Sequence, residues 1–257
     1  MNKKISEVLR QIEHDNDVRI IYACESGSRA WGFASQNSDF DVRFIYMHNR
    51  DWYLSIAEKR DVIELPVDEI LDVNGWDIRK ALQLLRRSNA PLMEWLVSPI
   101  KYFGMDAALT PLLELSRKAF LPDASFHHYL SMAKNNLIKV QETETPKIKT
   151  YLYALRPLLC GKWIKEFGDQ PPMLIDDLLS AFLPDTRSKI RRQIDNIITL
   201  KKEGIESVAM GRSTLLENYL MSQLSELSNY SPYRSKKEHL ESFDSLFREM
   251  IELYLKE

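Results

Sequence analysis

The chain has 257 residues, of which 44% are hydrophobic and 28% are charged, and its formal net charge is −2. These values are typical of globular proteins and exclude a disordered or fibrous chain, and the length suits one large or two modest domains. Only 8 residues are glycine, which disfavours an all-β chain rich in turns and predicts that helices predominate.

The first part of the chain carries the patterns of a mixed α/β fold. Apolar residues at positions 5, 8, 9 and 12 recur at helical period and predict a helix near the amino terminus. Strands are predicted over residues 18–24, 39–47, 62–67 and 69–73, where β-branched and aromatic residues concentrate. From Asp77 the apolar period becomes helical again, and Asn89-Ala90-Pro91 ends that helix.

The residues after 105 have helical periodicity almost throughout. Helices are predicted over about 106–120, 123–142, 147–167, 173–183, 186–203, 213–228 and 235–256. Pro157 predicts a kink or break in the third of these, and Ser235 with Glu238 has the spacing of a capping box. The sequence therefore predicts an α+β fold, with a mixed part over 1–105 and an all-helical part over 106–257.

Gly27 and Ser28 follow the first predicted strand and are placed to open a helix. Glycine lets the backbone approach a phosphate, free N–H groups at a helix start attract anions, and the serine hydroxyl adds a donor. Arg29 comes next and has two interpretations, the neutralisation of a triphosphate or a structural role. Most Gly-Ser pairs are ordinary turns, so the pair alone indicates a phosphate site only weakly.

Asp39 and Asp41 form an acidic pair on the strand predicted over 39–47. Residues i and i+2 of a strand point to the same face, so the two carboxylates repel each other unless a cation binds between them. Carboxylate oxygens suit Mg²⁺ or Mn²⁺. The alternative is an exposed strand with two solvated aspartates, but the apolar residues that alternate with the acids favour a buried strand. Arg43 shares the acidic face, and one interpretation pairs it with Asp41 or a neighbouring acid.

A site for phosphoryl transfer with two metal ions usually needs a third acid from a neighbouring strand. Asp72 lies between apolar residues at the end of a predicted strand and is the preferred candidate. Asp77 is the rival, but it stands where a helix begins, and an aspartate in the first turn has a sound structural role there.

The order of these features resembles the DNA polymerase β nucleotidyltransferase superfamily. The segments GSRAWGFAS (27–35) and SDFDVRFIY (38–46) resemble, more narrowly, the predicted nucleotidyltransferases associated with bacterial and phage RNA-repair pathways. Further segments that carry this likeness are WDIRK (76–80), EWL (94–96) and YLYALRPLL (151–159). The likeness covers roughly residues 20–165. Asn89-Ala90-Pro91 departs from the Asn-Pro of the family pattern, which affects a turn and not the site.

The resemblance implies a catalytic domain over 1–105, built on a small mixed β-sheet with helices, and an all-helical substrate-binding or accessory domain over 106–257. It also implies a metal-dependent transfer of a nucleotide from a nucleoside triphosphate such as ATP. Asp39, Asp41 and Asp72 would be the catalytic residues and would ligate Mg²⁺ or Mn²⁺. Gly27 and Ser28 would hold the β- and γ-phosphates, with Arg29 beside them.

The acceptor and the base stay open at this level, because no motif encodes them. The acceptor hydroxyl belongs to an RNA end, a protein or a small molecule. The alternative function is a catalytically degenerate module that binds nucleotide or RNA, motivated by basic segments in the helical part over 147–165 and 187–202. An intact set of acids counts against that alternative. The oligomeric state is not indicated.

Cysteine usage and hydropathy favour a cytoplasmic protein. Cys24 and Cys160 are too few and too far apart for a disulfide framework, and no Cys/His cluster suggests zinc. The first residues lack the apolar core of a signal peptide, and no uncharged apolar run approaches the ~18 residues of a membrane-spanning helix. We therefore expect no membrane partner.

Overall fold

The computed structural model describes residues 1–66, 70–205, 211–232 and 240–255. These residues form two compact units. The first, called the sheet unit, contains Met1–Gly27, Asp39–Phe120 and helix α12 (Leu240–Leu255). The second, called the helical unit, contains Ser28–Ser38 and the residues from Leu121 through helix α11 (Thr214–Ser228).

The sheet unit is built on five strands: β1 (Arg19–Glu25), β2 (Phe40–Met47), β3 (Val62–Glu64), β4 (Leu71–Asp77) and β5 (Lys101–Gly104). Their order across the sheet is β3-β4-β2-β1-β5. Only the central pair, β2 and β4, is parallel, and the other neighbours are antiparallel. The sheet is therefore mixed, as the resemblance implied.

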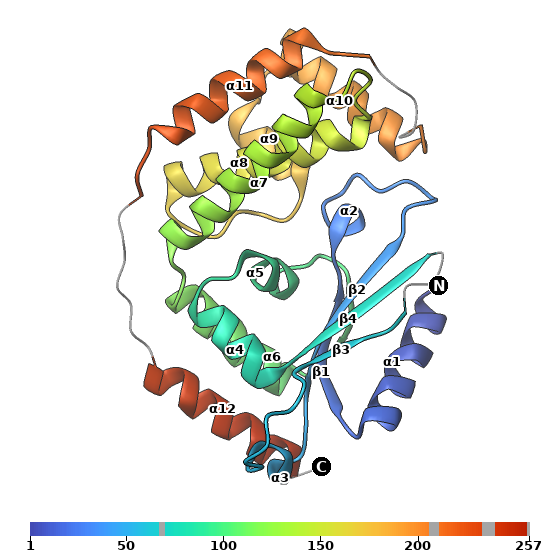
Figure 1. The fold of residues 1–257 in the computed structure, drawn as a ribbon, viewed down its shortest axis with the longest axis vertical. Helices are drawn as coiled ribbons and strands as arrows, with labels where there is room; N and C mark the ends of the chain where they lie inside the picture. The colour runs from blue at the N-terminus through green and yellow to red at the C-terminus, as the bar shows by residue number, and fades with distance from the viewer. Residues whose placement is uncertain (67–69, 206–210, 233–239, 256–257) are drawn as a thin grey trace. The chain divides into compact units, whose positions relative to one another are not determined.

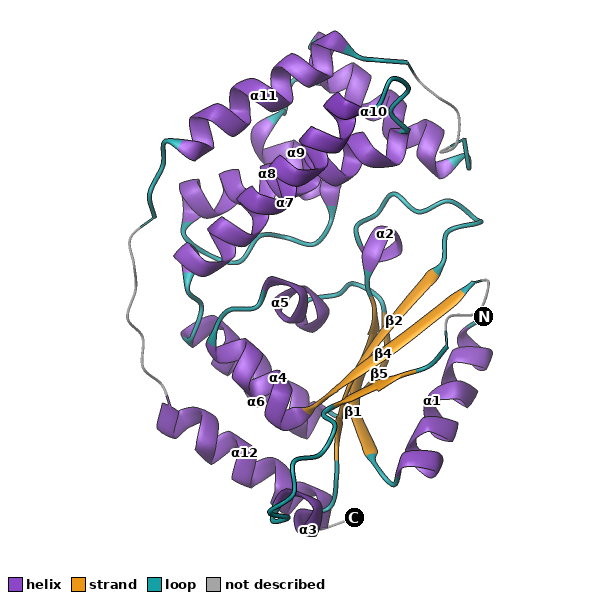
Figure 2. Cartoon of the chain, viewed as in Figure 1, coloured by secondary structure: helices purple, strands orange, loops and turns teal. Residues whose placement is uncertain are grey.

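Helices cover both faces of this sheet (Figure 1, Figure 2). The helices of the sheet unit are α1 (Asn2–Asn16), α3 (Arg50–Tyr53), α4 (Ile78–Arg86), α5 (Ala90–Leu96), α6 (Asp106–Lys118) and α12. The apolar stripe of α1 packs on one face, against Val42 and Phe44 among others. Side chains alternate along a strand, so Asp41 and Arg43 point to the opposite face, on which α4, α5 and α6 lie.

The helical unit contains α7 (Pro122–Glu142), α8 (Ile148–Phe167), α9 (Ile175–Phe182), α10 (Lys189–Lys202) and α11. Helix α2 (Gly27–Ala30) spans the boundary between the two units, because Gly27 belongs to the sheet unit and the residues from Ser28 belong to the helical unit. Helix α8 is buried on nearly all sides, which fits its high apolar content. Among the described residues, no helix is long and apolar enough to cross a membrane.

The predicted elements are confirmed in kind, with differences at several boundaries. Helix α8 runs through Pro157 without a break, although a proline inside a helix costs about 3 kcal/mol; burial of the surrounding turns offsets that cost. The strand predicted to end at residue 73 continues to Asp77, and the strand predicted over 62–67 ends at Glu64. Residues 67 and 69 and the capping pair Ser235 and Glu238 lie outside the described residues.

The two units also differ from the division expected at residue 105. Helix α6 lies beyond that boundary but belongs to the sheet unit, because its apolar side packs against β1 and α5. Helix α12 packs on α4 and α6 and so joins the same unit from the other end of the chain. The residues 28–38 group with the helices instead. Which part is catalytic and which accessory stays a prediction.

Candidate active site

The parallel pairing of β2 and β4 brings two of the predicted site acids together. In this register Asp41 lies opposite Asp72, 31 positions later in the chain. Paired residues of neighbouring parallel strands point to the same face, so the two carboxylates are neighbours at one end of the sheet. Their side chains are 29% and 35% exposed, which leaves room for a ligand from solvent.

Arg43 joins the two carboxylates. Its Nη2 donates to Asp41 Oδ1 at 3.1 Å and to Asp72 Oδ2 at 2.8 Å. Its Nη1 donates to the carbonyl oxygens of Val42 at 3.1 Å and Asp72 at 3.0 Å. The interpretation of Arg43 as the partner of neighbouring acids is therefore confirmed. One positive charge stands between two negative ones, which relieves their mutual repulsion.

Gly27 lies against Asp41 from the end of β1. Its φ is +60°, and a Cβ atom at this position would stand 2.0 Å from Asp41 Oδ2. The backbone N–H of Ser26 donates to Asp41 O at 2.9 Å, which holds the chain close to β2 just before Gly27. Only glycine permits both the left-handed conformation and the close approach to the carboxylate.

Glu25 is a further residue at this site, and the sequence analysis did not single it out. Its side chain is fully buried, and its Oε1 accepts the backbone N–H of Asp41 at 2.8 Å. The hydroxyl of Tyr102 donates to Oε2, and the hydroxyl of Ser98 donates to the Glu25 carbonyl oxygen at 2.6 Å. A charged residue at the end of an apolar strand is the signal that could have identified it, because buried carboxylates need partners.

The remaining predicted site residues are placed as follows. Asp39 is exposed and directly precedes β2 in the sheet unit. Ser28 is buried in the first turn of α2, and its carbonyl oxygen accepts the N–H of Phe33 at 3.1 Å. Arg29 Nη2 donates to the carbonyl oxygen of Ser38 at 2.6 Å, so this guanidinium closes the loop that contains it. The phosphate-binding roles of Gly27, Ser28 and Arg29 stay predictions.

Asp77 has a structural role at the opposite end of β4. It is fully buried and caps α4, where Oδ1 accepts the N–H of Arg79 at 2.8 Å and Oδ2 accepts the hydroxyl of Tyr53 at 2.8 Å. Burial raises its pKa to about 6. Five residues of strand, roughly 16 Å, separate Asp77 from Asp72, so the register places Asp72 and not Asp77 opposite Asp41.

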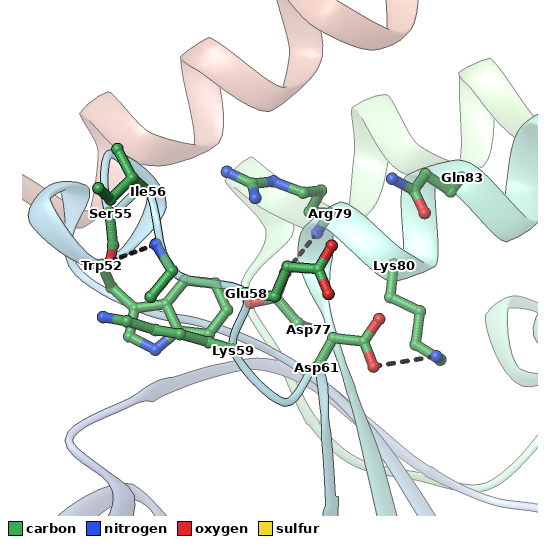
Figure 3. A pocket seen from close by; sticks show the side chains of 11 residues that line it. Trp52, Ser55, Ile56, Glu58, Lys59, Asp61, Asp77, Arg79, Lys80 and Gln83 are labelled. Atoms are coloured by element: carbon green, nitrogen blue, oxygen red, sulfur yellow. Dashed lines mark hydrogen bonds and ion pairs between the residues drawn. The ribbon is translucent and has the colours of Figure 1, made fainter.

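A polar pocket of about 420 Å³ lies beside Asp77 (Figure 3). Asp61, Arg79 and Lys80 also line it, and the Lys80 ammonium pairs with Asp61 at 3.0 Å. The lining contains as many acidic as basic side chains, three of each, so its formal charge favours neither an anion nor a metal ion.

The basic residues of the helical unit are largely engaged within that unit. Arg156 is buried, donates to the carbonyl oxygen of Met173 at 3.1 Å and stacks on Trp31 with its guanidinium 4.5 Å from the ring centre. Lys165 pairs with Glu226 at 2.6 Å. Two of the basic side chains that gave rise to the idea of a nucleic-acid binding module, Arg156 and Lys165, therefore have structural partners.

The donor atoms of Asp41 and Asp72 suit a divalent cation, since both offer hard carboxylate oxygens on one face. Arg43 holds the position between them. Across the described ranges of the chain, no group of three or more His, Cys, Asp or Glu side chains is close enough to hold a metal ion. Asp41 and Asp72 are thus two neighbouring carboxylates, and their role as metal ligands stays a prediction.

Comparison with known proteins gives three findings. A model of the RNA repair pathway DNA polymerase beta family matches residues 1–249. Uncharacterized protein YcgL of Bacillus subtilis (strain 168) is 39% identical over 227 residues, which cover 88% of this chain and 86% of that protein. A nucleotidyltransferase-like protein of known crystal structure, from Exiguobacterium sibiricum 255-15, aligns over 98% of this chain and 80% of its own at 14% identity and a TM-score of 0.31. So low a score supports no inference.

The family match confirms the resemblance found in the sequence. It covers the helical unit and also the sheet unit up to residue 249, which lies within α12. The chain belongs to the RNA repair pathway DNA polymerase beta family.

Proposed function

We propose that this protein is a metal-dependent nucleotidyltransferase, which moves a nucleoside monophosphate from a nucleoside triphosphate to an acceptor hydroxyl. The observation that supports it most directly is the pairing of Asp41 with Asp72 across two parallel strands, with a cationic group between them. Membership of the family supports the same reaction class.

In the proposed site Asp39 and Asp41 are the acidic pair that ligates Mg²⁺ or Mn²⁺, and Asp72 is the third acid. A bound divalent ion would supply positive charge where the attacking and leaving oxygens become negative. Gly27, with no Cβ, lets the backbone approach the phosphates, while Ser28 and Arg29 are predicted to donate to them. Glu25 fixes the backbone N–H of Asp41 and so holds that carboxylate in place.

The proposed reaction is an in-line displacement at the α-phosphorus. The acceptor oxygen forms a bond to this phosphorus, the bond to the bridging oxygen breaks, and pyrophosphate leaves. The proton of the acceptor hydroxyl passes to the Asp72 carboxylate, which is exposed enough to return it to solvent.

An RNA end is the first acceptor to test, because the family's name refers to RNA repair. A protein hydroxyl and a small molecule are the other candidates. The base of the nucleotide and a cytoplasmic location stay predictions.

The test is label transfer from a panel of α-labelled nucleoside triphosphates to RNA, protein and small-molecule acceptors, with Mg²⁺ or Mn²⁺. We expect transfer by the wild-type chain and its loss in Asp41→Asn and in Asp72→Asn. Asp15→Asn, which changes an exposed acid of α1, is the matched control and keeps activity. Transfer that persists in Asp41→Asn contradicts the assigned site. Metal-independent nucleotide or RNA binding, with no transfer to any acceptor, contradicts the enzyme and supports the binding module.

A further inference from the structure

Arg43 contacts both acids of the candidate site through one nitrogen atom. Nη2 reaches Asp41 Oδ1 at 3.1 Å and Asp72 Oδ2 at 2.8 Å, which places a positive charge on the line between the two carboxylates. A divalent ion shared by the same two oxygens would need the same place. The guanidinium and the ion therefore exclude each other from this position.

The second nitrogen of the guanidinium anchors Arg43 independently of the acids. Nη1 donates to two backbone carbonyl oxygens, those of Val42 at 3.1 Å and Asp72 at 3.0 Å. These bonds tie the side chain to both parallel strands. The loss of the Nη2 contacts would thus release the carboxylates while the side chain keeps part of its support.

We propose that Arg43 is a resident counter-cation, which pairs with Asp41 and Asp72 in the absence of metal and is displaced from them when a divalent ion binds. This inference rests on the proposed function. Without a cation the two neighbouring carboxylates repel each other and the strand ends that carry them are destabilised. With Arg43 in place the apo protein keeps both carboxylates aligned, but the guanidinium then competes with the metal ion.

Competition makes a prediction that a supporting role does not. If Arg43 only positioned the acids for the metal, its removal would weaken metal binding. If Arg43 competes, its removal takes away the charge that the metal ion has to displace, and metal binding becomes tighter. We expect Arg43→Gln to bind Mn²⁺ roughly tenfold more tightly than the wild type, because the metal ion no longer has to displace two partly exposed ion pairs.

The experiment measures Mn²⁺ binding by the electron paramagnetic resonance signal of the free ion, without nucleotide. Arg43→Lys keeps the charge, and we expect its affinity to stay near that of the wild type. Arg60→Gln is the matched control, because it removes the same charge from an exposed pair with Glu64 in the same unit. Adding Asp41→Asn to Arg43→Gln abolishes the tighter binding if the ion lies at this site.

Tighter binding in Arg43→Gln, with none in Arg60→Gln, supports the proposal, and unchanged or weaker binding overturns it. A second measurement uses the wild-type chain and does not depend on the folding of a variant. Addition of Mg²⁺ should shift the side-chain ¹⁵N resonance of Arg43, and saturation without a shift overturns displacement. Because both readouts omit nucleotide, a chain that behaves as described but transfers nothing refutes only the proposed function.

Discussion

Gly27→Ala tests the closest contact of the candidate site. The substitution adds one methyl group to a residue with φ +60°, and that group would stand 2.0 Å from Asp41 Oδ2 and 3.0 Å from Asp41 Cγ. Two separate effects are therefore expected. The backbone is strained because alanine disfavours positive φ, and the carboxylate must move because the two atoms cannot occupy the same space.

The structure indicates how large each effect is. The left-handed conformation costs alanine roughly 1 to 2 kcal/mol. Overpacking in a rigid core costs about 1 to 3 kcal/mol, but Asp41 is 29% exposed and can rotate away from the methyl group. Rotation gives up the contact with Arg43, which as a partly exposed pair contributes about 1 kcal/mol or less. Because rotation costs less than a backbone shift, we expect a total loss of about 2 to 3 kcal/mol and a displaced Asp41 carboxylate.

A double-mutant cycle in urea separates the two effects. In an Asp41→Ala background only the Cβ of residue 41 remains, 3.5 Å from the added methyl group and in ordinary contact. Gly27→Ala should then cost only the backbone strain, which leaves a coupling of about 1 kcal/mol between the two positions. Gly168→Ala is the strain control, since Gly168 has φ +71° and no heavy atom within 4 Å of the added carbon. A coupling near zero, with Mn²⁺ affinity unchanged in Gly27→Ala, refutes the reasoning.

Substitutions of Asp77 and Glu25 test the two buried carboxylates. Burial raises the pKa of Asp77 from 3.8 to about 6, so the folded state holds this proton more tightly than the unfolded chain. Relative to Asp77→Asn, the wild type should therefore lose about 2 to 3 kcal/mol of unfolding free energy as the pH rises from about 4 to about 7. Parallel curves of unfolding free energy against pH for the two proteins would contradict this. Glu25→Gln should lower the free energy of unfolding by about 1 kcal/mol or less, because the Tyr102 hydroxyl can reverse and accept from the new amide. Glu25→Leu should lower it by about 1 to 3 kcal/mol, because it removes the acceptor of the Asp41 N–H. Equal losses in chemical denaturation would show that the charge of Glu25 matters instead.

The elements that periodicity predicts are those whose packing repeats over several turns or strand residues. Helix α1 buries every third or fourth side chain, and strand β2 begins with alternation and ends in a run of buried apolar residues, so both patterns are clear in the sequence. Strand β5 was not predicted, because its four residues are mostly exposed and it exists through pairing with β1. Helix α5 was not predicted either. Asn89 caps this helix, and Pro91 lies in its first turn, where proline is well tolerated. The segment Asn89-Ala90-Pro91, which was interpreted as the end of one helix, is therefore the start of the next.

The candidate site shows the same limit at the level of side chains. The strand period places Asp41 and Arg43 on one face, and this could be predicted from residues 39–47 alone. The meeting of Arg43 with Asp72 depends on the parallel register of β2 and β4, which no local pattern encodes. The place of Glu25 under the backbone of Asp41 likewise depends on the pairing of β1 with β2. Contacts of this kind follow from topology, so a resemblance to a family anticipates them better than periodicity does.

Strand β4 shows how environment divides the roles of two identical residues. Asp72 is 35% exposed and accepts from the guanidinium of Arg43, so its carboxylate is open to solvent. Asp77 is fully buried, and its two oxygens are occupied by a hydroxyl and a backbone N–H. Releasing Asp77 to bind a metal would leave the amino end of α4 without its cap and the Tyr53 hydroxyl without its acceptor. The free energy of those two lost contacts, about 1 kcal/mol or more each, favours Asp72 as the acid that is free to ligate.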